Sequence, residues 1–538
     1  MQTYKQNLKN EAREKLVKHA IQSLTDERHS SFLVSQEHFI KITDHFNKMF
    51  FKFLGNKNFE YINQYNWLFS SEKNNWLKFY KEKCKSKLAS ELKVLYLSGP
   101  EPANDIEILC NNGIILENIW AIESDKKIYK EALKSLIENK IHIKLHRGSL
   151  AEFFELTNHE FDIVYFDACT PILSTQQSPL EIIKQLFVNK RLTGLSTFIT
   201  NFAEPGDNYN WGDILATWFA TKEFYEVPSV DDEFGMSPLE KSSSFSLYSS
   251  FINQHLDSYY DTFLTHFIPT IASEIIPMWQ LSSLGSVQRN HLLNEQLLQK
   301  ELKIIKSDKI NANYSDEILK EIPHYILSID NYPLLNWVRL INNNLPKDHT
   351  LRQFINSNRK KMTIEDALYI GSLLKRFEEV DSGFKTFIHN ICGEGLKEII
   401  TRLDFFDRNM NLTCDIPMKN LLIELLLGIY GHPYIAHTEK TMGIKYKAKN
   451  TWMYSNVFVF DQCRYLYDFL PTLDLWESFF ENISHQTIIR GCIDEIRRNH
   501  LHLNNSLFKW GFIEGIYGEF THSTLSERIN LNIENIDV

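Results

Sequence analysis

Five residues that could take part in chemistry each follow a short apolar run in the middle of the chain. These residues are Gly99, Glu123, Ser149, Asp167 and Asn201. An aspartate can accept a proton, orient a nucleophile or stabilise a positive charge. A glutamate at the end of a strand can accept hydrogen bonds from both hydroxyls of a ribose, and a glycine lets the backbone approach a ligand closely. The set therefore predicts a nucleoside site beside a group that handles charge.

These residues depend on an alternation of strands and helices that starts at Lys93. The apolar runs predict strands at residues 94–97, 119–122, 141–145, 161–166 and 195–199, with two more at 224–227 and 244–252. Helical spacing of apolar residues separates the runs. This alternation predicts a parallel sheet covered on both faces and, with right-handed crossovers, a doubly wound α/β fold. Because ligands bind beyond the carboxyl ends of such strands, we expect the five residues to share one edge.

The flanking segments are expected to be helical. Residues 1–90 have amphipathic spacing and predict an N-terminal helical cap without a motif that carries chemistry. Residues 91–254 are the predicted α/β domain. Residues 255–538 are predicted to be a mainly α-helical C-terminal region, interrupted by a short β element at Val457–Phe460.

The composition is that of a soluble globular protein. The chain has 538 residues, of which 43% are hydrophobic and 23% charged. Its seven cysteines form no CxxC pair, which argues against a disulfide framework or a zinc cage. His500 and His502 have no nearby third ligand, so no metal site is predicted. The N-terminus lacks a signal peptide's apolar core, and no apolar run reaches the roughly 20 residues of a membrane span. We expect a cytoplasmic protein with no membrane partner.

The charge balance excludes a globally basic coat but leaves one local exception. The formal net charge is −10. Close to Trp452 and Tyr454, however, the chain carries Lys440, Lys445, Lys447 and Lys449. Lysines combined with aromatic side chains can hold a nucleic acid by charge and stacking, so nucleic acid is a candidate partner. A solvated loop is the alternative interpretation of the same stretch.

Taken in order, five motifs resemble those of the class I S-adenosylmethionine-dependent methyltransferases. The motifs are KVLYLSGPEPANDIEIL, NIWAIESD, IKLHRGSLAEFF, FDIVYFDACTP and LSTFITNF, and the resemblance covers about residues 93–252. It implies a seven-stranded methyltransferase-like sheet, S-adenosyl-L-methionine as cofactor and transfer of a methyl group to an unidentified acceptor. The helical regions exceed what a small substrate needs, so we expect them to select a macromolecular acceptor.

The resemblance implies a cofactor-binding set at the strand ends. Its members are Gly99, Glu101, Asn104, Glu123, Ser149 and Leu150. The family usually has several glycines in the first turn, but residues 98–102 contain one glycine and two prolines, which supply no N–H donor. Glu101, Asn104 or Asp105 is therefore expected to bind the cofactor's ammonium. Capping of a helix is the alternative role for Asn104, Asp105, Glu123 and Ser149.

The same resemblance places the acceptor near Asp167. Asp167 is the predicted catalytic residue, with Thr170 and Asn201 as predicted substrate contacts. Methyl transfer in line needs mostly the positioning of the acceptor, so few strictly catalytic residues are required. Cys169 is not in a Pro-Cys pair, and we interpret it as a small packed residue rather than a nucleophile.

Two other classes of function are compatible with the sequence. A non-catalytic interaction or sensing protein on a degenerate methyltransferase scaffold would account for the glycine-poor turn and for Ser149, since a fold alone does not establish activity. A nicotinamide-dependent enzyme is disfavoured because the first turn lacks G-x-G-x-x-G.

Overall fold

A computed structural model describes most of the central α/β region and parts of the flanking segments. The described residues are 7–41, 43–44, 59–206, 210–219, 245–284, 294–297, 299–300, 303, 333–359, 362–375, 393, 423–471, 475, 482–501 and 528–531.

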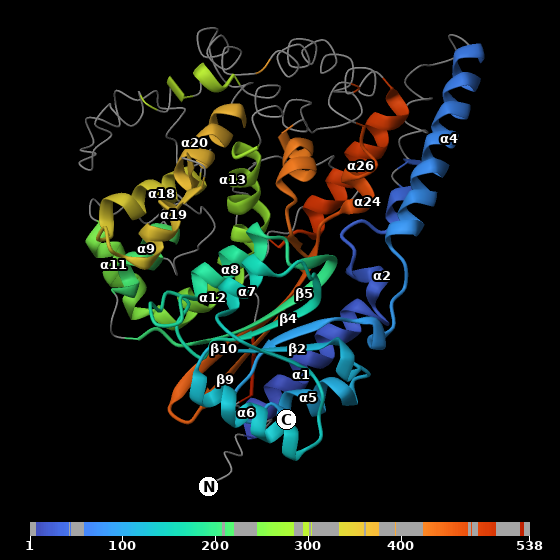
Figure 1. The fold of residues 1–538 in the computed structure, drawn as a ribbon. Coiled ribbons are helices and arrows are strands. Elements are labelled where there is room, and N and C mark those ends of the chain that lie inside the picture. Colours follow the sequence, from blue (N-terminus) through green and yellow to red (C-terminus); the bar gives the residue numbers. More distant parts are fainter. Residues whose placement is uncertain are drawn as a thin grey trace, which may run out of the picture.

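A mixed β-sheet forms the centre of the molecule (Figure 1). Its five parallel strands are β1 (Val94–Leu97), β2 (Ile119–Glu123), β3 (Lys144–Arg147), β4 (Phe161–Asp167) and β5 (Leu192–Ala203). They lie in the order β3-β2-β1-β4-β5, the order of the first five strands of a doubly wound sheet. The predicted parallel α/β core is therefore confirmed.

Burial on both faces explains why β1, β2 and β4 are so apolar, whereas β3 at the edge of the sheet is polar and mostly exposed. Every residue of β4 before Asp167 is buried, as are the first three residues of β1. Helices α7 (Leu150–Leu156), α8 (Pro179–Val188) and α12 (Leu256–Thr270) lie on one face (Figure 1). On the other face lie α1 (Asn7–Leu24), α5 (Ala103–Asn111) and α6 (Lys126–Glu138).

The sheet is completed by strands from the C-terminal part of the chain. A hairpin of β9 (Met442–Ala448) and β10 (Thr451–Asp461) lies beside β5. β10 runs antiparallel to β5, with Met453 opposite Ala203 and Asp461 opposite Leu195. The short element expected at Val457–Phe460 is thus part of an eleven-residue buried strand. Residues 255–538 supply strands as well as helices, while the predicted domain boundaries stay a prediction.

Two short strands extend the sheet beyond the expected count of seven. β8 (Ile435–Ala436) pairs with β10, and β11 (Ile529–Asn530) pairs with β9, which gives nine strands among the described residues. A separate two-stranded sheet joins β6 (Asn358–Arg359) to β7 (Met362–Thr363).

The strand predicted at residues 244–252 is wrong, because this stretch forms helix α11 (Phe245–Gln254). The alternating pattern of the stretch is also compatible with a helix, since Tyr248 and Ile252 are four residues apart. α11 packs closely on α9 (Trp211–Phe219), where a Cβ on Gly212 would lie 2.6 Å from the backbone oxygen of Ser249. The strand predicted at residues 224–227 lies outside the described residues.

The remaining elements are helical, and within the described part of the chain none is a long apolar helix able to cross a membrane. The predicted N-terminal helices are present, and α1 packs along β5, β9 and β10. The other helices are α2 (Arg28–Ser31), α4 (Phe59–Lys83), η2 (Ala89–Glu91), η3 (Leu116–Asn118), η4 (Ile271–Ile275), α13 (Ile276–Ser282), α18 (Pro333–Asn344), α19 (Thr350–Ile355), α20 (Ile364–Lys375), η6 (Leu427–Gly431), α24 (Arg464–Tyr467) and α26 (Ile483–Asn499).

Candidate functional site

The parallel order brings the predicted strand-end residues to one edge of the sheet. Asp167 of β4 and Asn201 of β5 are register partners. Glu123 is the last residue of β2. Gly99 lies two residues after the end of β1, and Ser149 lies two residues after the end of β3. Because all five strands run the same way, these residues line the carboxyl edge, where ligands of doubly wound sheets bind.

Asp167 is held by three side chains, one of which comes from the N-terminal helix. Its Oδ1 accepts hydrogen bonds from Asn201 Nδ2 at 2.7 Å and from Cys169 Sγ at 2.8 Å. Its Oδ2 lies 2.9 Å from the Nζ of Lys9 in α1. The N-terminal segment therefore supplies a charged group to the candidate site, which the sequence analysis did not expect.

The amide of Asn201 is itself fixed by the C-terminal hairpin. Its Nδ2 also donates to the Oη of Tyr446 in β9 at 3.0 Å. Its Oδ1 accepts from the Oγ of Ser455 in β10 at 2.7 Å. Since Asn201 and Ser455 are buried, the orientation of the Asn201 amide is fixed by partners on both of its ends.

The ion pair sets the charge state of Asp167. Burial alone would raise the pKa of this carboxyl. The charge of Lys9 and the hydrogen bonds from Cys169 and Asn201 outweigh burial, however, and hold the pKa below its usual range. The pKa of Lys9 is raised, because the charge of Asp167 outweighs the effect of burial. Asp167 is therefore a carboxylate at neutral pH that is suited to hold a positive charge rather than to remove a proton.

Cys169 is neither packed in the core nor poised as a nucleophile. Cys169 is exposed, and its backbone adopts a left-handed conformation with φ of 53°. Desolvation of the thiol and the charge of Asp167 raise the pKa of Cys169 to about 12. The packed position expected from the sequence is wrong, and the protonated thiol serves as a donor to Asp167.

A second ion pair links α1 to the edge four residues further along the helix. The Nε of Arg13 lies 2.7 Å from the Oδ1 of Asp105 in α5. Burial raises the pKa of Asp105 to about 6, although the charge of Arg13 opposes that shift. Helix α5 begins at Ala103 after Pro102, so Asp105 is not its N-cap.

The turn after β1 leaves room for a ligand. A Cβ placed on Gly99 would meet no heavy atom within 4 Å. Glu101 and Asn104 are exposed, and Asn104 Nδ2 donates to the carboxylate of Glu101 at 3.3 Å. Asn104 also lies inside α5 rather than at its cap, so the capping alternative is wrong for Asn104 and for Asp105.

Glu123 at the end of β2 and Ser149 after β3 both accept local hydrogen bonds, but only Ser149 caps a helix. Glu123 is partly buried, its Oε1 accepts from the backbone N–H of Asp125 at 2.8 Å, and burial raises its pKa. The N-cap of α6 is Asp125, not Glu123. Ser149 does cap α7, because its Oγ accepts from the N–H of Glu152 at 3.1 Å. Leu150 is buried behind this cap.

The group of residues at these three strand ends suits S-adenosylmethionine. The carboxylate of Glu123 can accept from ribose hydroxyls, and the open turn at Gly99 admits close approach. The exposed carboxylate of Glu101 can pair with an ammonium group. Ser149 is the weakest member, since its hydroxyl is already engaged in the helix cap.

Thr170, three residues after Asp167, has an unsatisfied hydroxyl. Its Oγ1 is buried without a hydrogen-bond partner among the described residues, while its carbonyl accepts from Ala203 N–H at 3.1 Å. A buried hydroxyl without a partner costs free energy, and a polar group of a ligand would relieve that cost.

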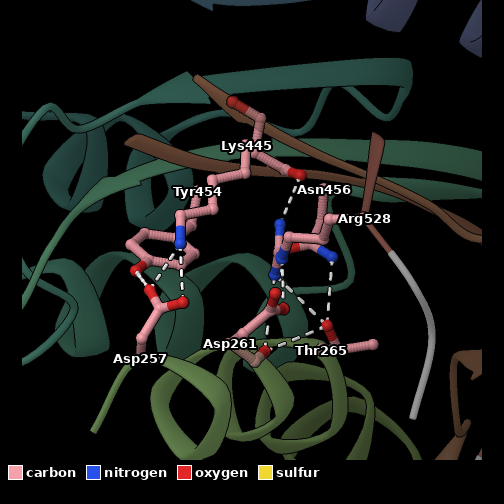
Figure 2. A network of polar contacts seen from close by, with 8 residues as sticks. Asp257, Asp261, Thr265, Lys445, Tyr454, Asn456 and Arg528 are labelled. Atoms are coloured by element: carbon pink, nitrogen blue, oxygen red, sulfur yellow. Dashed lines mark hydrogen bonds and ion pairs between the residues drawn. The ribbon is translucent and has the colours of Figure 1, made fainter. Parts of the chain in front are cut away.

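The predicted lysines are divided between a strand and its flanking turns. Lys445 and Lys447 lie in β9, so the solvated-loop interpretation is wrong for them, while Lys440 and Lys449 lie in turns beside the strand. Figure 2 shows the Nζ of Lys445 between the two carboxylate oxygens of Asp257, the more distant of which is 2.7 Å away. Lys440 pairs with Glu27 at 2.6 Å. Lys447 lies 5.7 Å from the ring centroid of Trp452. Carboxylates of the same chain thus neutralise Lys440 and Lys445, and a nucleic-acid contact through the four lysines stays a prediction.

Arg528 anchors the last described segment across the sheet (Figure 2). Its guanidinium forms an ion pair with Asp261 of α12. It also donates to the backbone carbonyl oxygen of Ser455 at 2.6 Å and to Oδ1 of Asn456 at 2.8 Å. This network joins the residue before β11 to β10 and to α12.

Lys9, Arg13, Tyr446 and Ser455 are residues at the site that sequence analysis missed. The four-residue spacing of Lys9 and Arg13 places both on one face of α1, which is a signal visible in the sequence. Nothing local indicates that this face meets Asp167 and Asp105. Within the described ranges, no group of three or more His, Cys, Asp or Glu side chains is arranged to hold a metal ion.

Comparison with known proteins yields only short structural matches. No protein-family model and no curated protein matches the chain. An S-adenosylmethionine-dependent methyltransferase from Clostridium acetobutylicum ATCC 824 is 20% identical with a TM-score of 0.18, over 24% of this chain and 50% of that chain. PKMT2 from Rickettsia typhi is 15% identical with a TM-score of 0.20, over 34% and 31%. An rRNA methylase from Streptococcus thermophilus is 14% identical with a TM-score of 0.17, over 21% and 65%. The chain thus spans half the length of the first of these proteins.

The fold itself is methyltransferase-like. Its sheet order, five parallel strands followed by the antiparallel β10 and then β9, agrees with the α/β architecture that the ordered motifs predicted.

Proposed function

We propose that the chain binds S-adenosylmethionine at the carboxyl edge of β1, β2 and β3 and transfers its methyl group to an acceptor anchored at Asp167. The observation that carries the proposal is the register pair of Asp167 and Asn201, which lies on the same sheet edge as Glu123 and the open turn at Gly99. The acceptor itself is not identified by this arrangement.

On the cofactor side, each residue has a role suited to its chemistry. Glu123 accepts from the ribose hydroxyls, Gly99 allows the backbone to approach, and Glu101 takes the ammonium. Leu150 offers an apolar contact, with Asn104 and Ser149 beside it as secondary polar contacts. When bound, the cofactor supplies a methyl group on an activated sulfonium.

On the acceptor side, the chain's contribution is positioning. Asp167 is ionised and fixed by Asn201, so it can hold a donor or a positive charge of the acceptor in one place. The unpaired hydroxyl of Thr170 provides a further contact. Holding the two reactants in line removes a large part of the activation barrier of such a transfer.

A non-catalytic interaction or sensing protein on the same scaffold is the second candidate. It is favoured by the ion pairs of Lys9 with Asp167 and of Arg13 with Asp105, which place α1 against the acceptor side of the edge. Nucleic acid as the acceptor has less support, because Lys440 and Lys445 are neutralised within the chain.

Calorimetric titration of the full chain with S-adenosylmethionine tests the proposal. We expect saturable binding that Glu123→Ala weakens at least about tenfold, which corresponds to one lost charge-assisted contact. Glu131→Ala, at an exposed position of α6, is the matched control and should bind as the wild type does. Absence of saturable heat at millimolar cofactor would reject the proposed function.

Transfer of a labelled methyl group into cell-extract RNA, DNA or protein separates the two candidates. An enzyme is expected to label an acceptor, and Asp167→Ala is expected to abolish the label. Cofactor binding without any labelled product supports the non-catalytic candidate instead.

A further inference from the structure

We infer that the cluster around Asp167 is a binding site for a primary alkylammonium group and that Lys9 of the same chain occupies it. The inference deepens the proposed function, on which it rests in treating the bound group as part of the methyl acceptor. Lysine side chains and polyamines are ligands of this class.

Two electron-rich atoms at the end of β4 and in the loop after it bind the ammonium of Lys9. Its Nζ lies 2.9 Å from Asp167 Oδ2 and donates to Cys169 Sγ at 3.6 Å, and Tyr446 is near enough to influence its charge. The side chain of Lys9 is only 23% exposed. A cation in this position is thus largely removed from water and held by protein groups.

The site is assembled without help from α1. Asn201 of β5 donates to Oδ1 of Asp167, and the Asn201 amide is itself bonded by Ser455 of β10 and Tyr446 of β9. The helix adds only the cation. A ligand that carries its own cation can therefore replace Lys9 without dismantling the groups that bind it.

The geometry favours an ammonium over a guanidinium. Oδ1 of Asp167 already accepts from Asn201 and Cys169, which leaves Oδ2 for the cation. A guanidinium reaches its full strength by bonding both carboxylate oxygens in parallel. An ammonium is a compact point charge that needs only one of them.

The position of this ammonium is where the acceptor is expected. Asp167 ends β4 on the ligand-binding edge, so an acceptor that reaches Asp167 must displace Lys9. Arg13 is bound separately at Asp105, so α1 keeps a second anchor when Lys9 leaves. The acceptor that competes best carries an alkylammonium of its own.

Binding of n-butylammonium chloride to the full-length Lys9→Ala variant tests the inference. The variant lacks the ammonium and most of the lysine stem, both of which n-butylammonium resupplies. In calorimetric titrations we expect it to bind the ligand at least about tenfold more tightly than the wild type does. Lys9→Met, which fills the same space with an uncharged chain, and Lys9→Ala combined with Asp167→Asn should both lose the effect. Equal affinity of wild type and Lys9→Ala, or equal binding of uncharged n-butanol, would overturn the inference.

A refolding measurement covers the case in which Lys9→Ala does not fold alone. We then expect its refolding yield to rise with n-butylammonium but not with tetramethylammonium at the same ionic strength, because the latter cannot donate a hydrogen bond to Asp167. No difference between the two salts overturns the inference. Neither of these two experiments contains S-adenosylmethionine, so their outcome concerns the ammonium site alone. Failure of the chain to bind S-adenosylmethionine would reject the proposed function and would leave the ammonium site as inferred.

Discussion

The ammonium of Lys9 lies 2.9 Å from the carboxylate of Asp167 and joins the first described helix to the end of the fourth strand. The two side chains are only 23% and 16% exposed. Arg13 and Asp105 also act electrostatically on this pair, but Lys9 is the cation that bonds Asp167 directly. An ion pair in this setting is more costly to break than to replace as a whole.

Lys9→Met is therefore expected to destabilise the chain more than removal of both charges does. We predict a loss of about 2–4 kcal/mol in the free energy of unfolding at pH 7, because Asp167 is left without its counter-charge. The double variant with Asp167→Asn should lose less than Lys9→Met alone. Urea unfolding of the three chains measures this, and additive losses would contradict it.

The pH dependence of that loss follows from the lowered pKa of Asp167. The contribution of the pair is complete above the ordinary value of 3.8 and disappears as the pH falls through the still lower pKa of the folded state. In Lys9→Met the charge that opposes burial is gone, so Asp167 has a higher pKa than in the wild type. The stability gap between the two chains should therefore narrow as the pH falls through the Asp167 pKa of the variant, and should close as it falls through the lowered pKa of the wild type.

Cys169 is predicted to resist alkylation although its residue is exposed. With a pKa of about 12, roughly one thiol in ten thousand is ionised at pH 8. Asp167→Asn removes the negative charge beside the thiol and leaves the ammonium of Lys9. We therefore expect Cys169 of this variant to react with iodoacetamide at least about tenfold faster than Cys169 of the wild type. Peptide mass spectrometry of Cys169 measures both rates between pH 7 and 10, with the partly exposed Cys110 as an internal reference. A wild-type rate equal to that of a free thiol would contradict the prediction.

The parallel half of the fold could be predicted because its strands carry a strong local signal. A parallel strand covered on both faces is an uninterrupted apolar run, and β1, β2 and β4 each end at a polar or glycine-containing turn. Those turns identified Gly99, Glu123 and Asp167 together with the edge on which they lie. The partners of an edge residue carry no such signal, since Lys9 and Tyr446 belong to segments far away along the chain.

β10 was hidden because polar residues interrupt its apolar pattern. Ser455 and Asn456 are buried in the middle of the strand, where one bonds Asn201 and the other bonds Arg528. Those two positions shortened the expected strand to Val457–Phe460. The pairing with β5 also joins residues about 250 positions apart, and no local pattern encodes a contact at that range.

Arg528 is predicted to be the anchor that holds β11 on the sheet. Its side chain is 2% exposed and bonds Asp261, Thr265, Asn456 and a backbone oxygen (Figure 2). Arg528→Ala should cost about 3–5 kcal/mol, because it leaves Asp261 without its cation and several polar groups without donors. Arg528→Lys should restore only part of that loss, since a point charge cannot serve all these acceptors.

Hydrogen exchange locates the effect of the Arg528 variants. β11 pairs with β9, where the N–H of Leu531 donates to the oxygen of Lys445 at 3.0 Å. We expect the amide of Leu531 to exchange faster in Arg528→Ala while the amides of β1 and β2 keep their protection. Uniform loss of protection across the sheet would assign Arg528 a global role instead.

Asn201→Asp is predicted to turn the site into a pair of competing carboxylates. The new carboxylate would lie where the amide nitrogen now donates to Asp167 at 2.7 Å, so two like charges would meet and one pKa would rise well above 3.8. For an acid whose pKa is raised by folding, stability falls as the pH rises through that pKa. We therefore expect Asn201→Asp to lose about 2 kcal/mol relative to wild type at pH 7 and to recover most of it only near pH 4, close to the ordinary pKa of an aspartate. The exposed Asn158→Asp is the control and should show no such difference in thermal melts at the two pH values. A loss of equal size at pH 4 and pH 7 would show that Asn201 acts only through packing and not by keeping Asp167 ionised for a cation.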